Sequence, residues 1–124
     1  MIEKISHIGI AVKSMEEALS VFQDGIGLEV ISTDEVETQK VRVAFLPVGE
    51  TRFELLEPTA DDSPIAKYLE SRGEGIHHIA LKVTNIEESL AQLKEKGVRL
   101  VNQEPVPGAH GTRIAFLHPR GPVG

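Results

Sequence analysis

Two histidines and one glutamate are the residues of this 124-residue chain whose types and spacing could support metal chemistry. His7 lies in the segment ISHIGIAV, and His78 lies in the similar segment IHHIALKV. Glu54 is a carboxylate within the otherwise apolar run FELL, and a buried carboxylate needs a strong partner such as a cation. Two imidazoles and a carboxylate suit a divalent first-row ion such as Co, Mn, Zn or Ni. We therefore predict a metal site formed by these three side chains.

The spacing of the two histidines comes from an internal repeat. At an offset of 71 positions, residues 5–20 and 76–91 are identical at seven of sixteen positions. The same offset aligns a second segment, in which Arg42, Ala44, Phe45 and Leu46 fall on Arg113, Ala115, Phe116 and Leu117. Two distant segments that share one offset indicate a duplicated module. A lone strand histidine is more often structural, but equivalent histidines of paired modules are expected to face one shared cleft.

The other three histidines are weaker candidates. His77 is expected to be structural or to support its neighbour, because successive side chains of a strand point to opposite faces. His110 and His118 lie in or beside expected loops and are interpreted as surface residues. Glu54 itself has an alternative interpretation, as a solvated residue of an edge strand.

Each repeat is expected to form a strand, a helix and further strands. Residues 5–12 and 76–83 alternate roughly between apolar and polar types, as half-buried strands do. A Ser or Asn followed three residues later by Glu predicts each helix start, at Ser14 and Asn85. The further expected elements are strands at 28–33, 40–47, 51–57, 98–102 and 112–118, glycine helix stops at Gly27 and Gly97, and a helix from Ser63-Pro64 through Leu69.

These elements predict an α+β fold in which two tandem βαβββ modules form a curved mixed sheet around a metal cleft. The chain is interpreted as one domain, 1–124, with module one at 1–58, a connecting helix within 59–74 and module two at 75–124. Module two is incomplete, because the counterpart of strand 51–57 would begin where the sequence ends. Either the chain is truncated or a partner chain covers the open sheet edge.

Composition narrows the class of function. The net charge is −6 and aromatic residues make up 4% of the chain, which opposes nucleic-acid binding through basic patches or stacked bases. No apolar run approaches the ~20 residues of a membrane span. There is no secretory signal pattern and no cysteine. A cytoplasmic enzyme or binding protein for a small molecule fits this composition best.

The same residues carry a family resemblance. HIGIAV and GEGIHHIAL resemble segments of the vicinal oxygen chelate superfamily. Within it, VRVAFLPVGETRFELLEP and DSPIAKYLESRGEGIHHIAL resemble the methylmalonyl-CoA epimerase family, and the resemblance covers essentially the whole chain. It implies a homodimer of paired βαβββ modules around a divalent metal. The implied reaction interconverts the 2R and 2S epimers of methylmalonyl-CoA, a CoA thioester of propionate breakdown.

The resemblance also assigns roles to individual residues. His7 and His78 match the two histidine ligands of the family, and Glu54 matches a position that holds Gln or Glu there. The fourth ligand, a Glu in a final strand, has no position in this sequence. Glu37 aligns with an acidic loop residue of relatives. The candidate catalytic carboxylates are therefore Glu37 and Glu54, for metal-assisted proton abstraction at C2 through an enolate.

Three alternatives share the expected fold. A glyoxalase I-like lactoylglutathione lyase would use a similar metal cleft on a glutathione hemithioacetal, and the segment DSPIAKYLESRGEGIHHIA favours the epimerase over it. A metal-free protein could bind an apolar molecule in the cleft, although three metal-type side chains argue against that use. A truncated, inactive fragment is the third alternative.

Overall fold

The computed structural model describes residues 1–118 of the 124-residue chain. The chain divides into two compact units. One unit comprises Lys4–Lys82, and the other comprises Met1–Glu3 together with the residues from Val83 onward. The strand expected to be missing, with its fourth ligand, would follow residue 118 and so lies outside the described residues. No described helix is long and apolar enough to cross a membrane.

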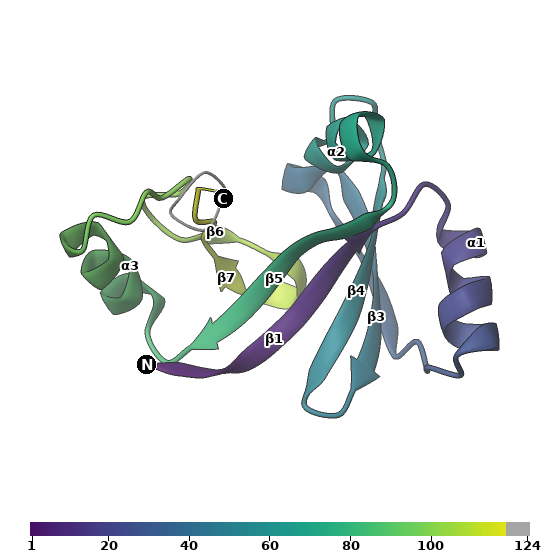
Figure 1. The fold of residues 1–124 in the computed structure, drawn as a ribbon, viewed down its shortest axis with the longest axis horizontal. Coiled ribbons are helices and arrows are strands. Elements are labelled where there is room, and N and C mark those ends of the chain that lie inside the picture. Colours follow the sequence, from purple (N-terminus) through teal and green to yellow (C-terminus); the bar gives the residue numbers. More distant parts are fainter. Residues whose placement is uncertain (119–124) are drawn as a thin grey trace. The chain divides into compact units, whose positions relative to one another are not determined.

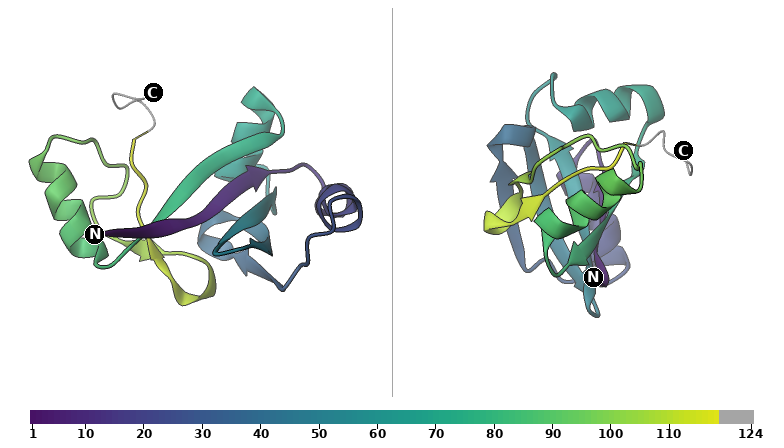
Figure 2. Two further views of the ribbon diagram at one scale, coloured as in Figure 1. Left: turned by 60° about the horizontal axis from the view of Figure 1, so that its bottom comes forward. Right: turned by 90° about the vertical axis from the view of Figure 1, so that its left-hand side faces the viewer.

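A mixed five-stranded sheet organises the unit Lys4–Lys82, in the order β2-β3-β4-β1-β5. The strands are β1 (Ile2–Ala11), β2 (Ser32–Val36), β3 (Val41–Val48), β4 (Thr51–Pro58) and β5 (Gly75–Val83). β1 runs parallel to β4, whereas β3 runs antiparallel to both β2 and β4. Figures 1 and 2 show β5 alongside β1 and running in the opposite direction. The α+β class and the mixed sheet are therefore confirmed.

The predicted caps begin the helices. Helix α1 (Met15–Leu19) follows Ser14, whose Oγ accepts the Glu17 N–H at 3.2 Å. Helix α3 (Ile86–Glu95) follows Asn85, whose Oδ1 accepts the Glu88 N–H at 3.0 Å. These contacts satisfy backbone N–H groups that have no partner within the helix.

A third helix and a π-helical turn are also present in the described residues. Helix α2 (Pro64–Arg72) begins after Ser63, whose Oγ accepts the Ile65 N–H at 3.1 Å, and it extends three residues past the predicted end. Helix α1 continues as a π-helical turn over Ser20–Gly25. Gly27 and Gly97 have φ values of 91° and 79°, the left-handed conformation in which glycine ends a helix at little cost.

The core of this unit lies between helix α1 and the sheet. Ala44, Leu46 and Leu55 are each 0% exposed, on the adjacent strands β3 and β4. They pack with buried residues of the α1 region, namely Val12, Met15 and Ala18. The β4 residues on either side of Leu55 point to the opposite face of the sheet, because strand side chains alternate. One strand therefore supplies both the core and the face that carries Glu54.

Three predicted strands are wrong in extent. Strand β2 begins only at Ser32, because the Leu28 N–H still donates to the Phe22 carbonyl of the preceding turn, at 3.0 Å. Residues 98–102 form only an isolated bridge, Leu100 to Leu117. Within 112–118, only β7 (Arg113–Ile114) forms, and it pairs with β6 (Val106–Pro107).

The side chain of Asn102 explains the loss of the strand at 98–102. Its Oδ1 accepts the Phe116 N–H at 2.8 Å. That N–H would otherwise donate to a backbone carbonyl in the ladder, and side-chain amides compete with secondary structure in this way. Residues 98–102 therefore contribute only the isolated bridge from Leu100 to Leu117 in place of the predicted strand.

The burial of Leu55 predicts how much stability is lost when its side chain is shortened. We expect Leu55→Ala to lower the free energy of unfolding by ~2–5 kcal/mol, because it removes a fully buried side chain and leaves a cavity. Val21→Ala is the matched control, since Val21 is 56% exposed, and it should change stability by no more than ~0.5 kcal/mol. Urea unfolding followed by circular dichroism measures both, and equal effects would contradict the assigned core.

Candidate functional site

The two repeat-related histidines meet on neighbouring strands. His7 lies on β1 and His78 lies on β5, and their Nε2 atoms are 3.0 Å apart. The ring centroids are 5.1 Å apart and the rings cross at 86°. Both residues belong to the unit Lys4–Lys82 and are half-buried. The structure thus brings together the two imidazoles that the repeat singled out.

A glycine on β1 makes room for this pair. A Cβ atom built on Gly9 would lie 2.3 Å from Cε1 and 2.6 Å from Nδ1 of the His78 ring. Any larger residue at this position would displace the ring, because real Cβ atoms do not approach other atoms so closely. Sequence reasoning missed Gly9, although the repeat contained a signal: its counterpart is Ala80.

Glu54 lies beside His7 and is held by an arginine. Its Oε2 is 3.0 Å from His7 Nδ1, and the residue is only 5% exposed. Arg52, two residues earlier on β4, donates from Nε to the same oxygen at 2.8 Å. The guanidinium also lies 5.6 Å from the centre of the Phe45 ring. Arg52 was not predicted, although residues two apart on a strand share a face, so the spacing of Arg52 and Glu54 could have indicated the pair.

Burial keeps both imidazoles neutral near pH 7. Burial, together with the smaller effects of His78 and Arg52, lowers the pKa of His7 to about 3. Burial likewise lowers the pKa of His78 to about 4, and His77 adds to the effect. A neutral imidazole keeps one nitrogen lone pair, which is the form that binds a metal ion.

His77 is also part of the cluster. Strand alternation predicts that it points away from His78, yet the two Nδ1 atoms are 2.9 Å apart. The ring of Tyr68, on α2, meets the His77 ring edge to face at 4.9 Å. The Tyr68 hydroxyl donates to the Ile76 carbonyl at 2.7 Å, so α2 is fastened to β5 next to the site.

The structure does not bring Glu37 to this cluster. Glu37 is exposed and begins a short 3₁₀ turn directly after β2. The strand register places that end of β2 near Pro58 of β4, whereas His7 is beside Arg52 at the other end. Arg52 and Pro58 are six residues apart on β4, which corresponds to about 20 Å.

The sequence matches a known family over most of its length. Residues 6–116 fit the glyoxalase/bleomycin resistance protein/dioxygenase superfamily. The chain belongs to this superfamily. That assignment agrees with the repeat and with the mixed sheet, and the predicted family resemblance is confirmed.

Relatives within the superfamily include epimerases. The chain is 42% identical to the uncharacterized protein YqjC of Bacillus subtilis, over 94% of this chain and 84% of the relative. It is 38% identical to the ethylmalonyl-CoA/methylmalonyl-CoA epimerase of Cereibacter sphaeroides, over 97% of this chain and 91% of that protein. A solved structure of methylmalonyl-CoA epimerase in complex with methylmalonyl-CoA and NH4+ matches with a TM-score of 0.91 and 38% identity, covering 96% of this chain and 87% of that one.

The side chains of the candidate site supply only part of the ligand set of a metal ion. The two imidazole nitrogens, 3.0 Å apart, can both lie ~2.0–2.1 Å from one ion. Glu54 instead faces Nδ1 of His7, the ring nitrogen opposite the one that faces His78. Within residues 1–118, no three His, Asp or Glu side chains are grouped around one ion position. The histidine pair therefore fits two neighbouring ligand positions of a first-row ion.

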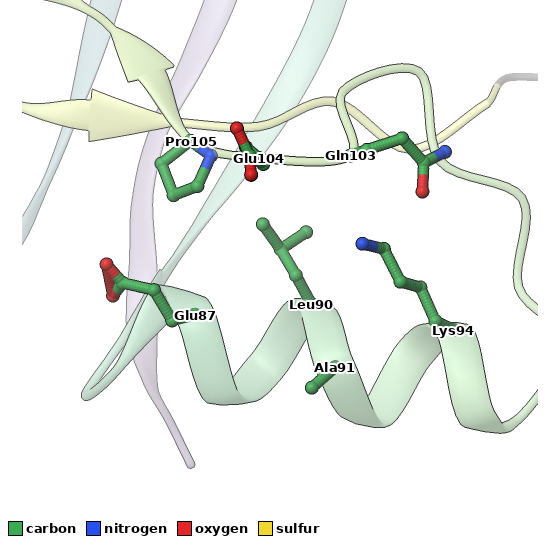
Figure 3. Close-up of a pocket in the computed structure, with 7 residues that line it drawn as sticks. All are labelled: Glu87, Leu90, Ala91, Lys94, Gln103, Glu104 and Pro105. Atoms are coloured by element: carbon green, nitrogen blue, oxygen red, sulfur yellow. The ribbon is translucent and has the colours of Figure 1, made fainter.

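A hollow lies in the unit that contains α3. It has a volume of about 230 Å³ and lies between α3 and residues 103–105. In Figure 3, Leu90 points from α3 toward this extended segment. Its apolar lining consists of Leu90, Ala91 and Pro105. Its polar lining consists of Glu87, Lys94, Gln103 and Glu104. No histidine lines it, so we place the candidate site at the histidine pair.

The lowered histidine pKa values predict acid sensitivity of the metal-free protein. The unfolded chain takes up protons near pH 6.5, whereas the folded protein takes them up only near pH 3–4. Stability should therefore be complete above pH 6.5 and fall as the pH drops below it, by up to ~1.4 kcal/mol per pH unit for each histidine.

Urea unfolding in EDTA at pH 7.5, 6 and 5 measures this dependence. The double variant His7→Gln/His78→Gln should have a much flatter profile, because amides do not titrate in this range. His110→Asn, a change outside the cluster, should keep the wild-type profile. An equally steep profile in the double variant would assign the acid sensitivity to other groups.

Proposed function

We propose that this chain is a metal-dependent epimerase that interconverts (2R)- and (2S)-methylmalonyl-CoA. The observation that carries the proposal is the convergence of His7 and His78, whose Nε2 atoms lie 3.0 Å apart, in a chain homologous to methylmalonyl-CoA epimerases. The homology supports a CoA thioester as the substrate class. The reaction requires an acidic proton at C2, the carbon between the thioester and the carboxylate. A cation would increase that acidity, and buried neutral imidazoles suit the binding of a cation.

His7, Glu54 and His78 are the proposed metal ligands. The ion, one of Co, Mn, Zn or Ni, would act as a Lewis acid toward the carbonyl oxygen of the thioester and so acidify C2. His7 and His78 would offer their Nε2 lone pairs. Glu54 would reach the same ion by turning from His7 Nδ1, and Arg52 would then lose its contact with that carboxylate oxygen.

The proton moves between C2 and a carboxylate. As the C2–H bond breaks, its electron pair delocalises into the thioester carbonyl and the proton passes to a carboxylate oxygen. Return of a proton to the opposite face of C2 gives the other epimer. We propose Glu54 for one face because it lies beside His7. Glu37, the other predicted carboxylate, lies about 20 Å away along the sheet, so it is the less favoured candidate. We also propose a cytoplasmic homodimer acting in propionate breakdown, as the family resemblance implies.

Metal content tests the ligand assignment. The purified wild-type protein should hold close to one divalent ion per subunit by elemental analysis. His78→Ala should reduce this value toward zero, because it removes one of the two converging nitrogens. His110→Asn should retain the wild-type content, and circular dichroism should show that both variants are folded. Full metal content in folded His78→Ala would overturn the site.

Hydrogen exchange tests the reaction. Incubation of methylmalonyl-CoA with the metal-loaded protein in deuterated water should replace the C2 proton with deuterium, and nuclear magnetic resonance can follow this. Turnover of a glutathione hemithioacetal without C2 exchange would instead assign lactoylglutathione lyase activity. Binding of neither substrate would favour a non-catalytic protein.

Two variants assign the proton-transfer residue. Glu54→Gln keeps an oxygen that can bind a metal but removes the basic carboxylate, so we expect the exchange rate to fall by about 10²–10⁴-fold. Glu37→Gln should have a small effect if Glu54 is the base that limits exchange. The reverse order of effects would assign this role to Glu37.

A further inference from the structure

His77 is not among the proposed ligands, yet its ring contacts one of them. Its Nδ1 lies 2.9 Å from Nδ1 of His78, with the ring centroids 5.2 Å apart and the planes at 88°. The equivalent position of the first repeat is Ser6, whose Oγ is 3.2 Å from Nδ1 of His7. Both repeats therefore place a polar side chain against Nδ1 of the following histidine, although the two residue types differ.

The carboxylate of Glu54 sets the direction of the contacts in the metal-free protein. Two groups face His7 Nδ1: a carboxylate oxygen of Glu54, which accepts, at 3.0 Å, and Nη2 of Arg52, which donates, at 3.5 Å. The shorter contact places the single N–H of His7 on Nδ1, which leaves a lone pair on Nε2. His78 Nε2, 3.0 Å away, must then be the donor. This leaves a lone pair on His78 Nδ1, and His77 Nδ1 must donate to it. One carboxylate thus determines the tautomers of three rings.

Metal binding requires the opposite tautomer of one ring. A cation bound by both Nε2 atoms needs a lone pair on each of them. His7 already has its lone pair there, but the hydrogen of His78 must move from Nε2 to Nδ1. It then points at His77 Nδ1, which must become an acceptor and carry its own hydrogen on Nε2. A residue that can only donate, or that is apolar, could not complete this exchange.

We propose that His77 is a positioning residue for a divalent first-row cation, and that its Nδ1 changes from donor to acceptor when the ion binds between His7 and His78. The inference rests on the metal site of the proposed function. It adds a residue that touches neither ion nor substrate and that determines which nitrogen of His78 carries the lone pair. Groups that orient a metal-binding histidine through its other nitrogen typically change metal affinity 10–100-fold.

Zn2+ affinity tests this role with a matched set of variants. His77→Leu keeps a branched side chain but has no polar atom at the δ position, so Zn2+ should bind 10–100-fold more weakly by titration calorimetry. His77→Asn should recover most of this loss, because its amide places either an oxygen or an N–H at the δ position. His110→Asn should bind like wild type. Its exposed site has a φ of 54°, which asparagine tolerates.

Nitrogen-15 resonances of the imidazoles give a second readout on the wild-type protein. Long-range proton–nitrogen spectra should show the His77 hydrogen on Nδ1 in EDTA and on Nε2 after addition of Zn2+. An unchanged His77 tautomer, or Zn2+ affinity in His77→Leu equal to that of wild type, would overturn the assignment of His77. Failure of the wild-type protein to bind Zn2+ would overturn the metal site itself, which is a distinguishable result.

Discussion

The pairing of β5 with β1 is the constraint on which the candidate site depends. His7 and His78 are far apart in sequence, and they meet only because their strands are neighbours in the sheet. A register shift of one residue would turn His78 to the other face of the sheet, since strand side chains alternate. Gly9 reinforces the register, because the His78 ring occupies the space that any other residue's Cβ would need. The hydrogen bond from the Tyr68 hydroxyl to the Ile76 carbonyl also links α2 to β5.

Strand β4 explains how a buried carboxylate is tolerated beside this pair. Leu55 faces the core under α1, whereas Glu54 faces the opposite side of the sheet, where Phe45 and Leu56 are also buried. An isolated charge there would be costly. Arg52 compensates it, and the arginine is itself 31% exposed in its side chain, so its charge keeps contact with water. A partly solvated partner of this kind lets the carboxylate exchange one contact for another at modest cost.

The sequence predicted the parts of the fold and site that depend on local pattern or on the repeat. Helix starts at Ser14, Ser63 and Asn85 follow from cap chemistry, which acts within a few residues. The meeting of His7 and His78 follows from the duplication. Arg52 was not predicted as a member of the cluster. His77 was predicted to be structural or to support its neighbour, but pointing away from His78, because strand alternation does not reveal that the two rings meet. The strand at 98–102 was predicted wrongly because an apolar, β-branched pattern does not reveal that Asn102 takes the N–H of Phe116.

The repeat supplies two equivalent histidines, but the groups around them are not equivalent. Gly9 corresponds to Ala80, and Ser6 corresponds to His77, so each half contributes a different kind of support. The first repeat orients its histidine with a carboxylate and a hydroxyl, and the second does so with an imidazole. A carboxylate can only accept, whereas an imidazole can donate or accept from the same atom. In the metal-free protein this asymmetry fixes the lone pair of the first histidine and leaves that of the second adjustable. The two histidines and the three groups that orient them all belong to the single unit Lys4–Lys82. The tautomer change that ion binding requires therefore lies in the second histidine, because the first already carries its lone pair on Nε2 in the metal-free protein.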